Sequence, residues 1–165
     1  NGERTPYIDP NLSAAFLGLN LHTGKYQMIK AVMEGVAFSL RQCMDACSNL
    51  GLKADFLVAS GGGARSIPWL QIQADIYNKP LKVAKIEEQA SIGAAIVAGV
   101  GAGVYKDIDE GCSQVVKYKD RMYEPDYANH LIYNEYYDVY KDAYHSGQKI
   151  LERVTELGRR HSEQG

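Results

Sequence analysis

One segment of the sequence limits the fold more than any other: a short apolar run, a glycine-rich turn and a helix, in that order. Residues 55–59 consist of Asp55 followed by four apolar residues, a pattern that predicts a short buried strand. They lead directly into Gly61-Gly62-Gly63, and residues 67–77 have the pattern of a helix. A second short apolar run, residues 81–83, follows. This order is typical of a βαβ unit, so the predicted class is α/β.

Three further helices are predicted around this unit. Apolar residues three and four apart from Ile29 to Cys47 indicate one that ends before Gly51, a glycine suited to the left-handed closing position. Ser91 to Gly103 indicates a small-residue helix with Ser91 as its N-cap, able to approach a sheet or another helix closely. A long amphipathic helix occupies much of Tyr127 to Leu157. Tyrosines repeat along it at helical spacing, which favours packing over ligand stacking: Tyr133, Tyr136, Tyr137, Tyr140 and Tyr144.

Composition excludes several classes of function. The 165 residues fit one domain, and a net charge of −2 gives no electrostatic case for nucleic acid or an anionic membrane. No apolar run is long enough to span a bilayer, and no secretory signal is visible. The three cysteines, Cys43, Cys47 and Cys112, form no CxxC pair, so they predict neither a disulfide framework nor a metal site. We expect small buried thiols in a reducing compartment, hence a cytoplasmic protein.

The glycine turn is the one local feature that points to a ligand. Without Cβ atoms, its backbone can come close to a flat or anionic molecule, and amides at the start of the next helix can cradle phosphate. The pattern is neither Gly-x-Gly-x-x-Gly nor Gly-x-x-x-x-Gly-Lys-Ser/Thr, so nucleotide contact and a merely tight turn both remain open. No histidine is paired in sequence with a serine or cysteine in a recognisable catalytic setting. The carboxylates that could serve as base or metal ligand are isolated, and such groups are usually caps or solvated: Glu3, Asp9, Glu34, Glu87 and Glu88. We predict no catalytic residue and no metal ligand.

Several motifs in one register nevertheless resemble a known family, the C-terminal domain of the FGGY carbohydrate kinases, most closely its xylulokinase branch. Gly2-Glu3-Arg4-Thr5-Pro6 is similar to the segment that opens this part of such chains. Residues 14–19, seven further residues and then residues 27–34 fit the family's C-terminal signature. Residues 61–66, with Trp69, Gln71 and Asp75 beyond them, resemble the adenosine-binding loop and its helix, and the small-residue segment 90–99 is also similar.

The resemblance implies an actin-like ATPase lobe of the ribonuclease H-like type, a mixed sheet with packed helices. Residues 1–158 would form this nucleotide-side domain and residues 159–165 a polar tail. The cofactors would be ATP and Mg²⁺, with ADP as product. By carry-over, Gly62, Gly63 and Ala64 would contact adenine and ribose, with Gly61, Arg65 and Ser66 beside them. Ser66 would be the only polar residue placed to assist the nucleotide.

The resemblance also implies what this chain does not supply. The catalytic Asp and the sugar pocket would belong to an N-terminal lobe, with Glu3 and Arg4 beside the cleft between the lobes. The chain begins at Asn1 without an initiator Met, so we expect a trimmed fragment that is inactive alone. The intact enzyme would phosphorylate D-xylulose; the alternatives are another ketose or polyol, or a non-catalytic binding or assembly module. Apolar surface exposed near the glycine turn could support a homodimer.

Overall fold

The computed structural model describes residues 2–162. The chain forms two compact units, one made of the chain up to residue 53 together with residue 128 onward, the other of residues 54–127. Within the described residues, every helix is too short or too polar to cross a membrane.

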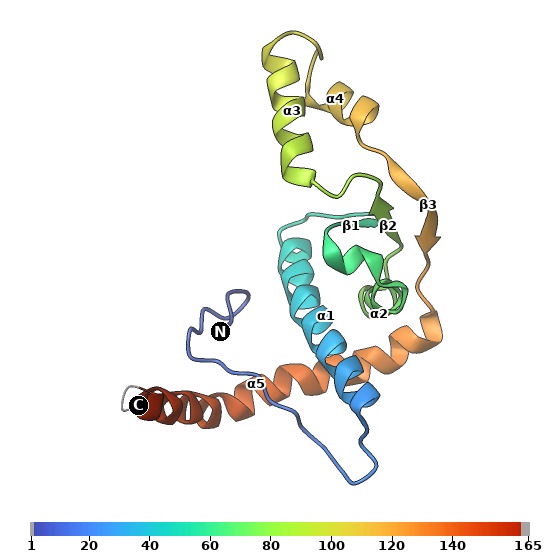
Figure 1. Cartoon of the computed structure of the whole chain (residues 1–165). Helices are drawn as coiled ribbons and strands as arrows, with labels where there is room; N and C mark the ends of the chain where they lie inside the picture. The colour runs from blue at the N-terminus through green and yellow to red at the C-terminus, as the bar shows by residue number, and fades with distance from the viewer. Residues whose placement is uncertain (1, 163–165) are drawn as a thin grey trace. The chain divides into compact units, whose positions relative to one another are not determined.

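The unit of residues 54–127 is built on a three-stranded mixed sheet (Figure 1). Strands β1 (Leu57–Ala59) and β2 (Leu81–Ala84) run parallel, with Leu57 opposite Leu81. Strand β3 (Tyr118–Tyr123) is antiparallel to β2, with an irregularity in register between Lys82 and Ala84. The predicted α/β class is therefore confirmed, although β1 begins two residues later than the sequence suggested.

Helix α2 (Ile67–Tyr77) connects the parallel strands and has the bounds that its sequence predicts. Its Leu70 and Ala74 are buried, together with Leu81 and Val83 of β2 and Tyr123 of β3. One face of the sheet and one face of α2 thus form the small apolar core of this unit. The helix ends at Asn78 in the left-handed conformation (φ +50°), and Pro80 follows, as is usual after a helix end.

Helices α3 (Gln89–Gly101) and α4 (Ile108–Val115) pack against each other. A Cβ atom added at Gly111 would lie 2.7 Å from the side chain of Ile96, so only glycine allows this approach. Helix α3 thus approaches another helix closely, as expected, but it does so through Ile96 and a glycine of α4, whereas its own Gly93, Ala94 and Ala95 are exposed. Its predicted N-cap is wrong: α3 begins two residues before Ser91, with Glu88 at the N-cap and the Gln89 side-chain amide bonded to the Ile86 carbonyl.

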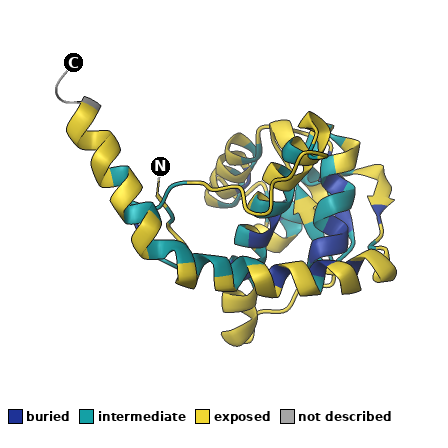
Figure 2. Cartoon of the chain, turned by 90° about the horizontal axis from the view of Figure 1, so that it is seen from below, coloured by how far each residue is buried: buried dark blue, intermediate teal, exposed yellow. Residues whose placement is uncertain are grey.

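The other unit holds α1 (Lys25–Asn49) and α5 (Tyr127–Ser162). Phe38 of α1 is 6% exposed and lies among three tyrosine rings of α5, with centroid distances of 6.1, 5.7 and 5.4 Å to Tyr133, Tyr137 and Tyr140. Figure 2 shows that most of α5 is exposed or half-buried. The Tyr137 hydroxyl also donates to Asp45 at 2.7 Å, and burial beside this carboxylate raises the pKa of Tyr137. The predicted packing role of the tyrosine repeat is confirmed for these three residues.

Several details of this unit differ from the expectations. The α1 stripe is half exposed at Ile29, Val32 and Leu40, because the helix buries Ala37 and Phe38 instead. The expectation of buried cysteines is wrong: Cys47 is exposed and Cys43 is only partly covered, as is Cys112 of α4 in the other unit. Gly51 has a φ of +83° directly after the α1 C-cap, as predicted.

Helix α5 continues past its predicted end to Ser162. The proposed tail is therefore helical through residues 159–162, and residues 163–165 lie outside the described part. The domain boundary at residue 158 stays a prediction.

Truncating Phe38 tests the aromatic packing of α1 on α5. We expect Phe38→Ala to lower the free energy of unfolding by about 3–5 kcal/mol, since it removes a buried ring and leaves a cavity. Val36→Ala, on the half-exposed side of the same helix, is the control and should cost less than about 1 kcal/mol. Urea unfolding followed by circular dichroism measures both; equal losses would contradict this packing.

Candidate functional site

The glycine turn lies at the carboxyl end of β1. Because β1 and β2 are parallel, residues 60–66 after β1 and residues 85–88 after β2 leave the sheet at the same edge (Figure 1). In open α/β sheets, ligands usually bind outside this edge. The predicted site residues, Gly61 to Ser66, all belong to the first of these two connections.

Gly61 sets the direction of the turn. Its backbone has φ +73° and ψ −166°, a region that essentially only glycine occupies. The chain then forms a single 3₁₀ turn, η1 (Gly62–Arg65), in which the Ala64 amide donates to the Gly61 carbonyl at 3.1 Å and the Ser66 amide to the Gly63 carbonyl at 3.2 Å. The predicted residues are thus brought together as one short, hydrogen-bonded turn.

The next two glycines have different surroundings. A Cβ atom added at Gly62 would meet nothing within 4 Å, whereas one at Gly63 would lie 3.0 Å from the indole nitrogen of Trp69. Within the part of the chain that is described, the amides of Gly62 and Gly63 donate to no backbone carbonyl. Gly62 therefore offers a bare, exposed backbone surface, whereas a side chain at Gly63 would press on the Trp69 indole.

Ser66 acts as the N-cap of α2. Its hydroxyl oxygen accepts a hydrogen bond from the Trp69 amide at 3.4 Å, which satisfies one of the free donors at the helix start. The hydroxyl that the family resemblance singled out as a possible nucleotide contact is therefore also a structural group. Its predicted role toward a nucleotide stays a prediction.

Two further residues of the resembling motif hold α2 in place. The Gln71 side-chain amide donates to Asp75 and to the Glu124 carbonyl, both at 2.8 Å. Asp75, only 3% exposed, also accepts the Asp126 amide at 2.8 Å. These bonds fasten α2 to the chain that leaves β3.

An ion pair joins the two connections at the sheet edge. Arg65, at the end of η1, donates to Glu87 through two nitrogens, Nε to Oε1 at 3.1 Å and Nη2 to Oε2 at 2.6 Å. The Arg65 guanidinium lowers the pKa of Glu87, and Glu87 raises that of Arg65. A lowered carboxyl pKa means that the pair persists at neutral pH and is lost only when the pH falls below the ordinary carboxyl range. The sequence offered Glu87 only as one isolated carboxylate.

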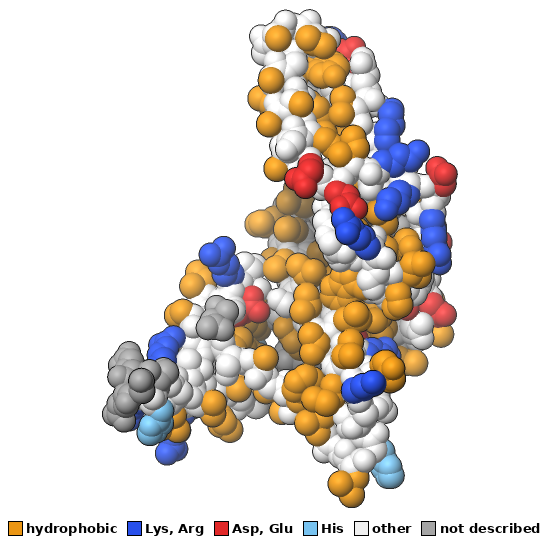
Figure 3. All heavy atoms as spheres, in the orientation of Figure 1, with side chains coloured by type: hydrophobic (Ala, Val, Ile, Leu, Met, Phe, Trp, Pro, Cys, Tyr) orange, Lys and Arg blue, Asp and Glu red, His pale blue; other side chains and the backbone are white. Residues whose placement is uncertain are grey.

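Apolar side chains flank the glycine turn. Val58 of β1 is 46% exposed and Ile67, the first residue of α2, is 51% exposed. Val97 and Val104 are also largely exposed in this unit, and Figure 3 shows hydrophobic atoms among charged ones on its surface.

Of the other candidate carboxylates, Glu88 is the N-cap residue of α3, whereas Glu3, Asp9 and Glu34 lie in the other unit. Glu3 accepts the amides of Arg4 and Thr5 at 2.9 and 3.2 Å and the Ser39 hydroxyl at 3.3 Å, so its carboxylate closes a turn and fastens it to α1. Among the described residues, no three His, Cys, Asp or Glu side chains gather in a way that could hold a metal ion.

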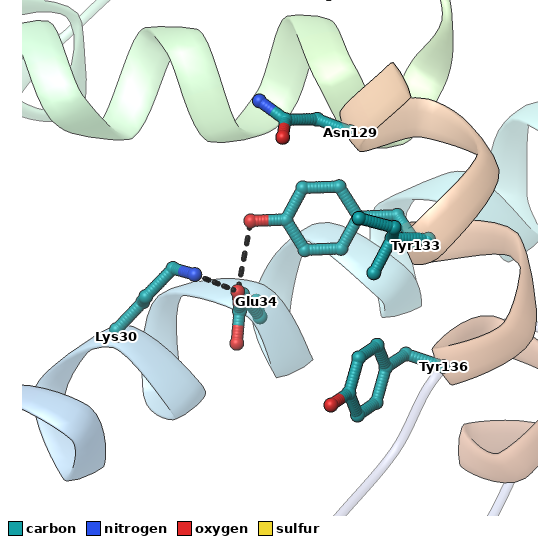
Figure 4. Close-up of a pocket in the computed structure, with 6 residues that line it drawn as sticks. Lys30, Glu34, Asn129, Tyr133 and Tyr136 are labelled. Carbon is teal, nitrogen blue, oxygen red and sulfur yellow. Dashed lines mark hydrogen bonds and ion pairs between the residues drawn. The ribbon is translucent and has the colours of Figure 1, made fainter. Parts of the chain in front are cut away.

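A surface hollow of about 270 Å³ also lies in that unit, between α1 and α5 (Figure 4). Glu34 forms an ion pair there with Lys30 at 3.1 Å and accepts a hydrogen bond from the Tyr133 hydroxyl at 2.8 Å. Tyr136 lines the same hollow and is 62% exposed. Because the Glu34 carboxylate is engaged with its two neighbours, its evident role is to connect the helices.

Comparison with known proteins agrees with this architecture. Residues 1–102 match the C-terminal domain of the FGGY family of carbohydrate kinases. A xylulose kinase of Staphylococcus epidermidis is 38% identical over 149 residues, which are 90% of this chain and 30% of that protein. A ribulokinase of Bacillus licheniformis is 30% identical over 149 residues, 87% of this chain and 27% of that protein.

Solved structures give the class of fold. The ligand-bound xylulose kinase from Lactobacillus acidophilus superimposes with a TM-score of 0.77 at 28% identity, covering 88% of this chain and 29% of that one. Together with the mixed sheet, this likeness defines the lobe as one of the actin-like ATPase fold. The chain belongs to the FGGY family of carbohydrate kinases, whose C-terminal domain it matches. It spans about 30% of the length of such relatives.

Two alanine substitutions separate the conformational role of Gly61 from the open surface at Gly62. Gly61→Ala should lower the free energy of unfolding by about 1–3 kcal/mol, because a side chain is strained at this φ and ψ. Gly62→Ala should change it by less than about 0.5 kcal/mol, since the added methyl group meets only solvent. Denaturant unfolding of both variants measures the difference, and equal stabilities would contradict the backbone geometry of the turn.

Proposed function

We propose that this chain is the nucleotide-side lobe of an ATP-dependent sugar kinase, with adenine and ribose lying against residues 61–66. The observation that carries the proposal is the open backbone of Gly62, held in a turn that Gly61 and the Trp69 contact of Gly63 define. A flat ring can approach such a surface without meeting a side chain. In this proposal the amides of Gly62 and Gly63, which donate to no backbone carbonyl among the described residues, would donate to nucleotide oxygens.

Within this proposal, Ala64, Arg65 and Ser66 border the nucleotide. Mg²⁺ belongs to the proposal as the companion of the phosphates, because this ion usually takes only one or two protein carboxylates and keeps the rest of its ligands from phosphate and water. Since the described residues contain no acidic cluster, we assign it no ligand in this chain.

D-Xylulose is the sugar we propose for the whole enzyme. The support is that the relatives of this chain include xylulose kinases by both sequence and structure. The ribulokinase similarity supports a second candidate, another ketose, because no sugar-selecting group is assigned to this chain.

Nucleotide binding tests the assignment of the loop. We expect calorimetric titration of this chain with ADP and Mg²⁺ to show weak binding, and Gly62→Ala to weaken it about tenfold, since a methyl group would occupy the ligand's space. Because this variant is expected to fold normally, a loss of ADP affinity would report on the binding surface and not on stability. Absence of heat at millimolar ADP, or unchanged binding by Gly62→Ala, would contradict the loop assignment.

An assay of sugar phosphorylation tests whether this chain supplies the catalytic base. Phosphoryl transfer needs a positioned base near the attacking hydroxyl, and we assign none in this chain. We therefore expect no D-xylulose 5-phosphate when this chain is incubated with ATP, Mg²⁺ and D-xylulose in a coupled ADP-release assay. Turnover above the rate of ATP hydrolysis without sugar would show that a base is present among these residues.

A further inference from the structure

Two loops meet at the proposed nucleotide edge, and one ion pair joins them. Residues 60–66 follow β1 and residues 85–88 follow β2, and a whole helix separates them along the chain. The Arg65–Glu87 pair bridges them with two N–H···O hydrogen bonds, whose nitrogen–oxygen distances are 3.1 and 2.6 Å. Paired bonds of this kind fix the orientation of both planar groups, which a single contact does not.

The position of Arg65 makes this contact relevant to the glycine turn. Arg65 is the last residue of η1, and the residues on either side of it form the turn's internal bonds, Ala64 amide to Gly61 and Ser66 amide to Gly63. The side chains of Arg65 and Glu87 are 70% and 43% exposed. Exposed pairs add little to overall stability, so the pair is poorly suited to hold the fold together.

We infer that Arg65 and Glu87 form a positioning clasp, which holds the glycine turn in the conformation that receives adenine and ribose. This inference rests on the proposed function. Glu87 is a positioning residue in it, because it acts through Arg65 and not on the nucleotide. The clasp raises the fraction of molecules whose Gly62 surface is ready to bind, and apparent affinity follows that fraction.

The same geometry allows a competing interpretation, which predicts the opposite change in ADP affinity when the charge of Glu87 is removed. If Arg65 bound the nucleotide phosphates directly, Glu87 would compete for the guanidinium, and removing its charge would strengthen ADP binding. The two cases therefore differ in how they respond to Glu87→Gln, which keeps the shape of the side chain and removes its charge.

The experiment compares Arg65→Ala, Glu87→Gln and the double variant with the wild-type chain. The ligands are ADP and adenosine, titrated by calorimetry, and hydrogen exchange at the Ala64 and Ser66 amides reports the order of the turn without ligand. Glu88→Gln is the matched control, because it removes the same charge from the adjacent position, where the side chain caps nothing.

For a clasp, we expect each single variant to weaken ADP and adenosine equally, by about two- to fivefold, the range an exposed ion pair allows. The double variant should be no worse than either single one, since both remove the same contact. Exchange at Ala64 and Ser66 should be faster in all three, and Glu88→Gln should behave as the wild type.

Three results would overturn the clasp. Unchanged exchange and binding in Glu87→Gln would show that the pair positions nothing. Stronger ADP binding in Glu87→Gln, or a loss in Arg65→Ala confined to ADP, would place Arg65 on the phosphates. A wild-type chain that binds neither ligand would overturn the proposed function, and the clasp as a nucleotide device with it, whereas the first two results leave that function intact.

Discussion

The parallel pairing of β1 with β2 is the constraint on which the rest of this site depends. Two parallel strands need a crossover, and α2 provides it, burying Leu70 and Ala74 against Leu81 of β2. The same pairing sends both loops out at one edge of the sheet. The open glycine turn and the Arg65–Glu87 contact exist because these two loops are neighbours in space.

The strand–turn–helix–strand core could be predicted because its signals are local. Helix α2 is bounded by Ser66 and Asn78, both residues that favour helix ends, and the prediction matched its limits. Strand β3 was missed because most of its residues are exposed and polar, with only Tyr123 buried; its pairing with β2 makes it a strand. Helix α4 was missed although Asp107, whose side chain accepts the Glu110 amide at 2.9 Å, is a recognisable cap.

The segment that forms the site could be predicted from the sequence, but the separate role of each of its residues could not. Three consecutive glycines look alike in sequence, yet they differ in the structure: Gly61 is required by its φ, and a side chain at Gly63 would press on Trp69. Gly62 combines an ordinary φ with open space where a Cβ atom would lie. The error at Ser91 has a related cause: a good N-cap residue lies inside α3 because the preceding residues already continue the helix. Glu87 could not be paired with Arg65 in advance, since their contact depends on the crossover geometry.

Binding of a nucleotide on the open face of the glycine turn is the central claim. Its most direct test is a two-dimensional amide NMR titration of the isotope-labelled chain with ADP and Mg²⁺. We predict that the largest shift changes fall on Gly61 to Ser66, with smaller ones near Glu87. Changes concentrated elsewhere, such as around the hollow formed by Lys30 and Tyr136, or no change at millimolar ADP, would contradict it.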